Sequence, residues 1–197
     1  MIIDVNVSEC DESFVEDLED IIEDTMVQMF VLHPKDVDSL ENVQELANEH
    51  NTIFYTTPAD LSDQADTNCV GICISKTDDL ASIDDRVVFV DEAKLDDTLY
   101  NELKNHKGII LNATKSHDEL ENFFVSIGPG CVEEFDKDIL KNIPMEKMVL
   151  QSNYPKHGFN DIYTSMETIS EATLRAEMSI AAEATKNTMK LFAMRRL

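Results

Sequence analysis

Small polar residues follow two short apolar runs at opposite ends of the sequence. The first run, MIIDVNVS (residues 1–8), contains Asn6 and Ser8, and the second, MVLQSNYP (residues 148–155), contains Asn153. In a parallel α/β protein such runs form buried strands, and the polar residues after them lie at the carboxyl end of the sheet, where α/β enzymes place their chemistry. Because the first and last strands of a closed barrel are neighbours, we expect Asn6, Ser8 and Asn153 to converge.

The elements that would position these residues alternate along the chain. Helical spacing of apolar residues predicts helices over 13–24, from 38 onward, and over 95–105, 116–123, 132–143 and 165–195, the last as one or two helices. Apolar or β-branched runs predict strands over 1–8, 26–32, 52–57, 69–75, 86–90, 108–111, 124–127 and 148–155. This alternation is typical of a TIM-like (β/α)8 barrel, and a chain of 197 residues is short enough that several helices must be trimmed. We predict a single domain over 1–197; an open, doubly wound parallel sheet is the alternative.

The charge and hydropathy of the chain exclude several classes of partner. The formal charge of −24 repels a phosphate backbone, so we expect no nucleic acid. No apolar run approaches the roughly 20 residues that span a bilayer, and the N-terminus lacks a secretory signal, so we expect a cytoplasmic protein without membrane contact. We interpret the acidic residues as solvated helix faces; a docking surface for a basic protein is the alternative.

The cysteines and histidines show no spacing that is typical of a metal site. Cys69 and Cys73 are four residues apart, and we interpret the cysteines as buried thiols. Two histidines, His33 and His117, lie near predicted strand ends, and we interpret them as surface or capping residues.

Several stretches resemble the TatD family of metal-dependent hydrolases, which are barrel-fold nucleases. SIAAEATKNTMKLF (residues 179–192) resembles the closing helix of that family, with its Asn and its terminal Leu-Phe, and NIPMEKMVLQSNYP (142–155) resembles its Ile-Pro, strand and acid-Thr-Asp-x-Pro pattern. MIIDVNVS resembles the family's first strand, in which an Asp precedes His-x-His, and GIILNATKS (108–116) resembles its sixth strand. The resemblance implies a barrel whose mouth holds divalent metal ions.

The residues at the family's metal-ligand positions are of other types. Only Asp4, which precedes the first pair, is unchanged. The first-strand His pair falls on Asn6 and Ser8, the fourth-strand Glu on Cys73 or Ile74, the fifth-strand His on Val90 or Asp91, the sixth-strand His on Asn112 and the eighth-strand Asp on Asn153. Amides and hydroxyls are weak, neutral ligands compared with imidazole and carboxylate.

We therefore predict that the chain has lost the divalent-metal site, carries no cofactor and serves a non-catalytic binding or scaffolding role. The alternative is a divergent metal-dependent hydrolase of the phosphodiesterase or DNase type. Its rebuilt site would hold a single Mg, Mn or Zn ion, with Asp4, Asp91, Glu92 and Cys73 as candidate ligands and with His33 and His117 near other strand ends. A third hypothesis is a small molecule bound at the barrel mouth by the amides of Asn6, Asn112 and Asn153.

Overall fold

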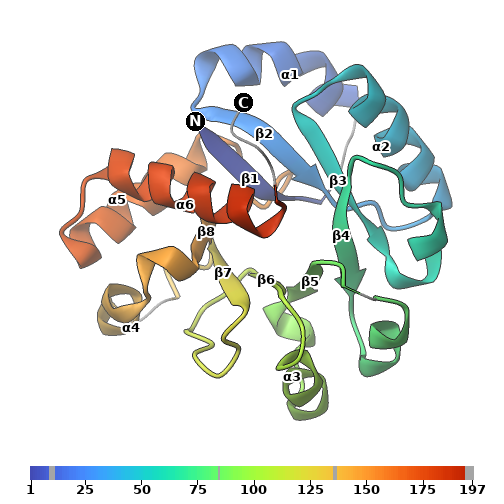
Figure 1. Cartoon of the computed structure of the whole chain (residues 1–197). Helices are drawn as coiled ribbons and strands as arrows, with labels where there is room; N and C mark the ends of the chain where they lie inside the picture. The colour runs from blue at the N-terminus through green and yellow to red at the C-terminus, as the bar shows by residue number, and fades with distance from the viewer. Residues whose placement is uncertain (9–11, 84, 135–136, 194–197) are drawn as a thin grey trace.

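The computed structural model describes residues 1–8, 12–83, 85–134 and 137–193. Eight parallel strands pair in the order in which they occur in the sequence, and they curve around a common axis (Figure 1). The strands are β1 (Ile2–Val7), β2 (Val27–Leu32), β3 (Ile53–Pro58), β4 (Cys69–Ile74), β5 (Val88–Asp91), β6 (Gly108–Leu111), β7 (Phe123–Ile127) and β8 (Met148–Leu150). This sequential order confirms the predicted (β/α)8 barrel, because a doubly wound sheet reverses its strand order at a switch point.

The barrel is nearly closed between its first and last strands. A parallel bridge joins Val7 to Tyr154, and the Ser8 N–H donates to the Tyr154 carbonyl at 2.9 Å. The Asn153 N–H donates to the Asn6 carbonyl at 3.1 Å. The backbone segments that carry Asn6, Ser8 and Asn153 therefore lie side by side, as the sequence predicts.

The helices that surround the barrel are unequal in length (Figure 1). They are α1 (Glu12–Asp24), α2 (Val37–Glu49), α3 (Asp97–Leu103), α4 (Lys137–Asn142), α5 (Asp161–Thr173) and α6 (Glu177–Leu191). Short 3-10 helices follow β3, β4 and β5 and precede β8: η1 (Ala59–Gln64), η2 (Thr77–Ser82), η3 (Glu92–Lys94) and η4 (Met145–Lys147). The predicted trimming of the helices is confirmed. Within the described residues, no helix has both the length and the apolar character needed to cross a membrane.

The helix predicted over residues 116–123 is wrong. The segment forms consecutive turns, in which the Leu120 N–H donates to the His117 carbonyl and the Phe123 N–H to the Leu120 carbonyl. Its capping-box spacing is present in the sequence, but the Ser116 hydroxyl bonds to Asp118 rather than to a helical N–H. His117 instead bonds to the carboxylate of Glu92, in the 3-10 helix η3 that follows β5, and the segment connects β6 to β7 through turns.

The helix predicted over residues 132–143 is shorter than expected. Helix α4 covers Lys137–Asn142, and residues 131–134 form turns. Phe135, which contributed to the predicted apolar stripe, lies outside the described residues. Leu140 and Ile143 are buried as predicted, so the two apolar residues at the end of the stripe dock this segment on the barrel.

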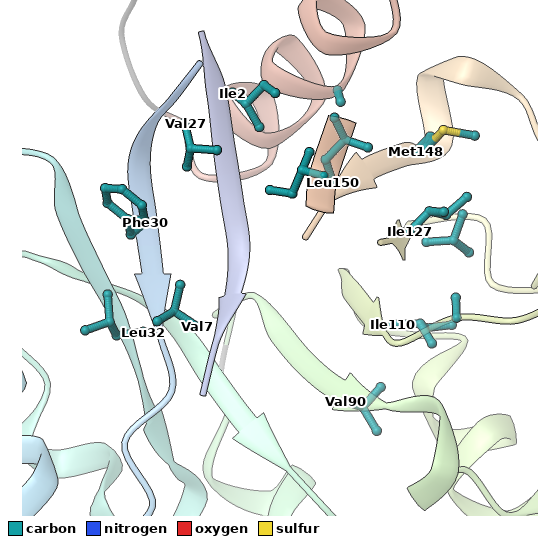
Figure 2. Packing of buried hydrophobic residues seen from close by; sticks show 14 of the residues in the cluster. Ile2, Val7, Val27, Phe30, Leu32, Val90, Ile110, Ile127, Met148 and Leu150 are labelled. Carbon is teal, nitrogen blue, oxygen red and sulfur yellow. The ribbon is translucent and has the colours of Figure 1, made fainter. Parts of the chain in front are cut away.

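The apolar core has two parts, one on each side of the barrel wall. The larger part lies between the strands and the surrounding helices, where Val27, Phe30 and Leu32 of β2 and Met148 and Leu150 of β8 contribute side chains (Figure 2). The smaller part fills the barrel interior and consists of Ile3, Val5, Met29, Val31, Val87, Phe89, Ile109, Leu111 and Val149. Alternate residues of each strand therefore face opposite sides of the wall, which is the period of two expected of a strand.

Helix α6 crosses the end of the barrel at which the strands begin (Figure 1). The Asn187 side chain donates to the carbonyls of Met145 and Met148, both at 2.8 Å. Just beyond the helix, the Phe192 ring stacks on Phe89 inside the barrel, with 5.8 Å between ring centroids. The end of α6 therefore plugs this side of the barrel with apolar side chains.

The sequence also predicts one apolar stripe over residues 172–194, and this prediction is only partly right. Leu174 has a positive φ of 57°, ends α5 and is 90% exposed, and Met178 is 65% exposed. Ala182 is exposed as well, whereas Ala181 is buried. The break between α5 and α6 rotates the stripe, so that Ile180, Ala181, Ala184, Thr185, Asn187 and Thr188 form the buried face.

Candidate functional site

Two adjoining cavities open at the carboxyl ends of the strands, and Asp91 lines both of them. The larger cavity has a volume of about 560 Å³ and the smaller one about 440 Å³. All six positions that match the ligands of the TatD pattern lie here: Asn6, Ser8, Cys73 and Asp91 line the larger cavity, and Asp91, Asn112 and Asn153 line the smaller one. Val90, the alternative match in β5, is buried in the core outside the barrel wall.

Three asparagine amides and one carboxylate are connected at this mouth. The Asn6 Nδ2 donates to the side-chain oxygens of Asn112 at 3.4 Å and Asn153 at 3.5 Å. The Asn112 Nδ2 donates in turn to the Asp91 Oδ2 at 2.6 Å, a short, charge-assisted bond. Side chains from β1, β5, β6 and β8 therefore form one hydrogen-bonded network.

Gln151 supports this network from below, and the sequence analysis did not identify it. Its Nε2 donates to the Asn112 Oδ1 at 2.5 Å, and its Oε1 accepts from the Asn112 N–H at 3.0 Å. The same Oε1 accepts from the hydroxyl of Ser126 at 2.7 Å. Gln151 directly follows the apolar residues of β8 and precedes Asn153 by two positions, within the MVLQSNYP stretch that the sequence analysis singled out.

The backbone at two of these positions restricts which residue types fit. Asn112 has a φ of 53° and Asn153 a φ of 64°, both in the left-handed region. Asn and Gly tolerate this conformation, whereas most residues lose roughly 1–2 kcal/mol in it. Asn is therefore among the few residue types that fit these two positions without backbone strain.

A second polar cluster joins His33, Thr56 and Cys73 at the floor of the larger cavity. The His33 Nε2 lies 2.8 Å from the Val5 carbonyl, and because a carbonyl only accepts, we assign the ring hydrogen to Nε2. The Nδ1 is then an acceptor that faces the Thr56 hydroxyl at 2.8 Å and the Cys73 thiol at 3.2 Å. Burial lowers the pKa of His33 to about 4 and raises that of Cys73 to about 12. Both groups are therefore neutral near pH 7.

The third cluster ties the loop after β6 to the end of β5. Glu92 accepts from the Thr114 N–H at 2.9 Å and from its hydroxyl at 2.6 Å, and the other carboxylate oxygen lies 2.6 Å from the His117 Nε2. Burial raises the pKa of Glu92, but the hydrogen bonds from His117 and Thr114 outweigh it, so its pKa is below the usual range. His33 and His117 are 9% and 7% exposed, so their interpretation as surface or capping residues is wrong.

The remaining candidates occupy different surroundings. Asp4 is fully buried between β1 and β8 and lines neither cavity of the mouth. Cys69 is partly buried and Cys131 is buried, while Cys10 lies outside the described residues. Ser8 donates its hydroxyl hydrogen to the Tyr154 carbonyl at 2.7 Å, so its side chain closes the barrel as well as lining the cavity.

The side chains at the positions that match the TatD ligands do not supply the donors of the divalent-metal site that the resemblance implies. The matching positions supply three amides, a hydroxyl, a thiol whose pKa is raised and one carboxylate, Asp91. Zinc and manganese sites need imidazoles, thiolates or several carboxylates. Across residues 1–8, 12–83, 85–134 and 137–193, no group of three or more His, Cys, Asp and Glu side chains is arranged to hold a metal ion.

No protein-family model matches the sequence. No curated protein matches it either.

Solved structures, in contrast, match over nearly the whole chain. A TatD homologue from Escherichia coli K12 matches with a TM-score of 0.78 at 14% identity, over 98% of both chains. A TatD-family hydrolase from Entamoeba histolytica matches with a TM-score of 0.67 at 9% identity, again over 98% of both. A dihydroxybenzoic acid decarboxylase from Polaromonas, solved with bound manganese and the inhibitor 2-nitroresorcinol, matches with 0.63 at 8% identity, over 100% of this chain and 98% of the other. The chain therefore has the fold of the TatD homologues and of other amidohydrolase-like barrels.

Proposed function

We propose that this chain is a non-catalytic binding protein that holds a small polar molecule at the mouth of its barrel without a divalent metal. The hydrogen bonds of Asn112 are the observation that carries the proposal. Its amide bonds to Asp91, Asn6 and Gln151 at once, so the Asp91 carboxylate, the one acid at the positions that match the TatD ligands of the mouth, takes part in an amide network. In a hydrolytic site Asp91 would coordinate an ion, and its short bond to the Asn112 amide competes with that role.

The network still presents hydrogen-bonding groups to a ligand. The Asn153 side chain lines the smaller cavity, and its amide NH2 has no hydrogen-bond partner among the described residues. The cavity volumes of about 440 and 560 Å³ fall in the range of small-molecule sites. Proteins of this fold also include the decarboxylase whose substrate is a small aromatic acid. The mouth is thus suited in size and chemistry to a small polar ligand.

Metal content and hydrolysis separate this function from that of a divergent hydrolase. We expect purified protein to contain far less than one ion of Mg, Mn or Zn per chain. We also expect hydrolysis of bis(p-nitrophenyl) phosphate to stay at background when each ion is added. A tightly bound ion together with turnover that is abolished in Asp91→Ala would overturn the proposal.

A ligand screen by thermal shift tests the binding role directly. Asn153→Gly is the suitable variant because Gly retains the left-handed backbone and removes only the amide. We expect compounds that raise the melting temperature of the wild type to have a smaller effect on this variant. Lys186→Ala, on the outer face of α6, is the matched control and should keep every hit. Hits that are unchanged in Asn153→Gly would place binding elsewhere.

A further inference from the structure

The lysines of this acidic chain gather around the mouth of the barrel. The chain has 16 Lys and Arg residues against 40 Asp and Glu. Five lysines nevertheless line the two mouth cavities, each in the loop after a different strand: Lys35 after β2, Lys76 after β4, Lys94 after β5, Lys115 after β6 and Lys156 after β8. All five side chains are exposed. The same cavities are lined by five acids, Asp60, Asp79, Asp91, Glu92 and Glu134, so the numbers of cations and acids at the mouth are equal.

Three of the five acids that line the mouth, Asp79, Asp91 and Glu92, are engaged by hydrogen bonds from the protein itself. Asp91 accepts from the Ala93 N–H at 2.9 Å as well as from Asn112. Asp79 accepts from the N–H groups of Ser75 at 2.8 Å and Lys76 at 3.2 Å. These carboxylates, like that of Glu92, fix the backbone of the loops. Their acceptor oxygens are therefore less available to the lysines than those of solvated acids.

Four of the five lysines at the mouth form no ion pair within the described residues, whereas two lysines elsewhere in the chain do. Lys104 pairs with Glu119 at 2.7 Å and Lys186 with Glu183 at 2.8 Å, both away from the mouth. Within the part of the chain that the structure describes, Lys76, Lys94, Lys115 and Lys156 have no carboxylate within 4.0 Å. Cations that surround a concave site without protein partners attract an anion, because the low-dielectric walls focus their field.

The larger cavity has apolar side chains in its lining beside the lysines of the mouth. Its lining combines the polar groups of Asn6 and Cys73 with the apolar side chains of Pro34, Pro58, Ala59, Ile74, Phe89 and Leu111. A naked inorganic ion would leave this wall hydrated, whereas a ligand with an apolar body would cover it. We infer that the mouth binds a small organic anion, with its charged group between Lys76 and Lys94 and its apolar body against Phe89. This inference rests on the proposed binding function and names the class of its ligand.

Matched probes test the charge and the apolar body separately. Benzoate and phenyl phosphate carry both, benzamide carries only the ring, and inorganic phosphate carries only the charge. Binding is measured by calorimetry on the wild type, on Lys76→Met, on Lys94→Met and on the double variant. The controls are Lys104→Met and Lys186→Met, which remove lysines that are paired away from the mouth. A second series at about 0.5 M salt screens the attraction.

We expect benzoate or phenyl phosphate to bind more tightly than benzamide and inorganic phosphate. Each lysine variant at the mouth should weaken that binding about fivefold, and the control variants should not weaken it. High salt should weaken anion binding in the wild type more than in the double variant.

Two results would overturn the inference. If benzamide binds as well as benzoate and loses affinity in Asn153→Gly, the mouth is a binding site but its ligands are not anions, so the proposed function survives alone. If none of the four probes binds at millimolar concentration, or if anions bind equally to the double variant, the lysines do not form an anion site. The thermal-shift screen then decides the proposed function independently.

Discussion

The carboxylate of Asp4 accepts hydrogen bonds from the backbone N–H of Ser152 at 3.0 Å and from the Ser152 hydroxyl, although 148 positions separate the two residues. It also accepts from the Asn6 N–H at 3.0 Å. These bonds join β1 to the segment after β8, where regular strand pairing is reduced to one bridge. The acid that is shared with the TatD pattern therefore closes the barrel in this chain.

The first prediction concerns how Asp4 makes stability depend on pH. Burial raises the pKa of Asp4 above its ordinary value of 3.8, although its hydrogen bonds to Ser152 and Asn6 oppose the shift. The Asp4 carboxyl group therefore binds its proton more tightly in the folded protein than in the unfolded chain. The protonated carboxyl group contributes stability that is fully present below about pH 4 and is lost as the pH rises through the pKa of Asp4 in the folded protein. Asp4→Asn should therefore gain stability relative to the wild type as the pH rises above about 4.

Urea unfolding of both proteins at several pH values measures that difference. Glu19→Gln, in an exposed part of α1, removes one negative charge without the burial and is the control. A contrary result would be a difference in unfolding free energy between Asp4→Asn and the wild type that stays constant with pH, or that changes as it does for Glu19→Gln. Either outcome would show that the buried Asp4 carboxylate does not cause the pH dependence of stability.

The second prediction concerns the left-handed backbone at Asn112. Asn112→Ala and Asn112→Gly both remove the amide, but only Gly accepts a φ of 53° without strain. We expect the Ala variant to be less stable than the Gly variant by about 1 kcal/mol in urea unfolding. At Lys186, an exposed position in α6, we expect the opposite order. Lys186→Gly should be less stable than Lys186→Ala, because Gly is the poorer helix former. Equal stability of the two Asn112 variants would contradict the strained turn.

The third prediction concerns the reactivity of the Cys73 thiol. Cys73 lines the cavity, but burial raises its pKa to about 12, and only the thiolate reacts with iodoacetamide. Its alkylation, followed by mass spectrometry, should be slow at pH 7 and should accelerate about tenfold per pH unit up to about pH 10. In urea the same thiol should react as an ordinary cysteine. A plateau below pH 9 in the folded protein would show that His33 activates the thiol.

The fourth prediction concerns Asn187 in α6. Asn187→Ala removes two hydrogen bonds and leaves the buried carbonyls of Met145 and Met148 without this donor. We expect the free energy of unfolding to fall by about 2–3 kcal/mol. The adjacent, exposed Lys186→Ala should change it by less than about 0.5 kcal/mol. A similar small effect at both positions would mean that α6 is not anchored through Asn187.

The fifth prediction concerns the end of the chain. Truncation after Ala182 removes Asn187 and the Phe192 ring that stacks on Phe89. It exposes the apolar interior where the strands begin, so we expect a protein that is insoluble or unfolds without a cooperative transition. Cooperative melting near the full-length temperature, seen by circular dichroism, would show that the barrel is complete without its closing helix.

Much of the barrel is predictable from the sequence because its strands are short, apolar and regularly spaced. MVQMFVL and GIIL are strands in the structure, at Val27–Leu32 and Gly108–Leu111, and the residues after the first and last strands converge as expected. The helix predicted over 116–123 is wrong because the prediction used only the local capping-box spacing. In the structure His117 bonds instead to Glu92, which is distant in the sequence. Such a contact depends on which loops the barrel brings together, and no local pattern contains that information.

The site was predictable at its outer positions and not at its supporting ones. Asn6, Asn112 and Asn153 were identified because they end strands, whereas Ser126 and Thr56 were not singled out within otherwise ordinary strands. The burial of His33 could not be predicted either. Its ring lies over Phe89 with 5.2 Å between centroids, a contact between β5 and the loop after β2 that depends on barrel curvature.

The apolar side chains at the end of α6, which fill the base of the barrel, determine the route by which a ligand reaches the mouth. Phe192, Phe89 and His33 form a column of rings from that base to the floor of the mouth. Within the described residues these rings separate the mouth cavities from the base of the barrel, so a ligand at the mouth enters and leaves at the carboxyl ends of the strands. A larger molecule that rests on the lysine-bearing loops would slow arrival and escape together, and so change the residence time of the ligand without changing its equilibrium affinity.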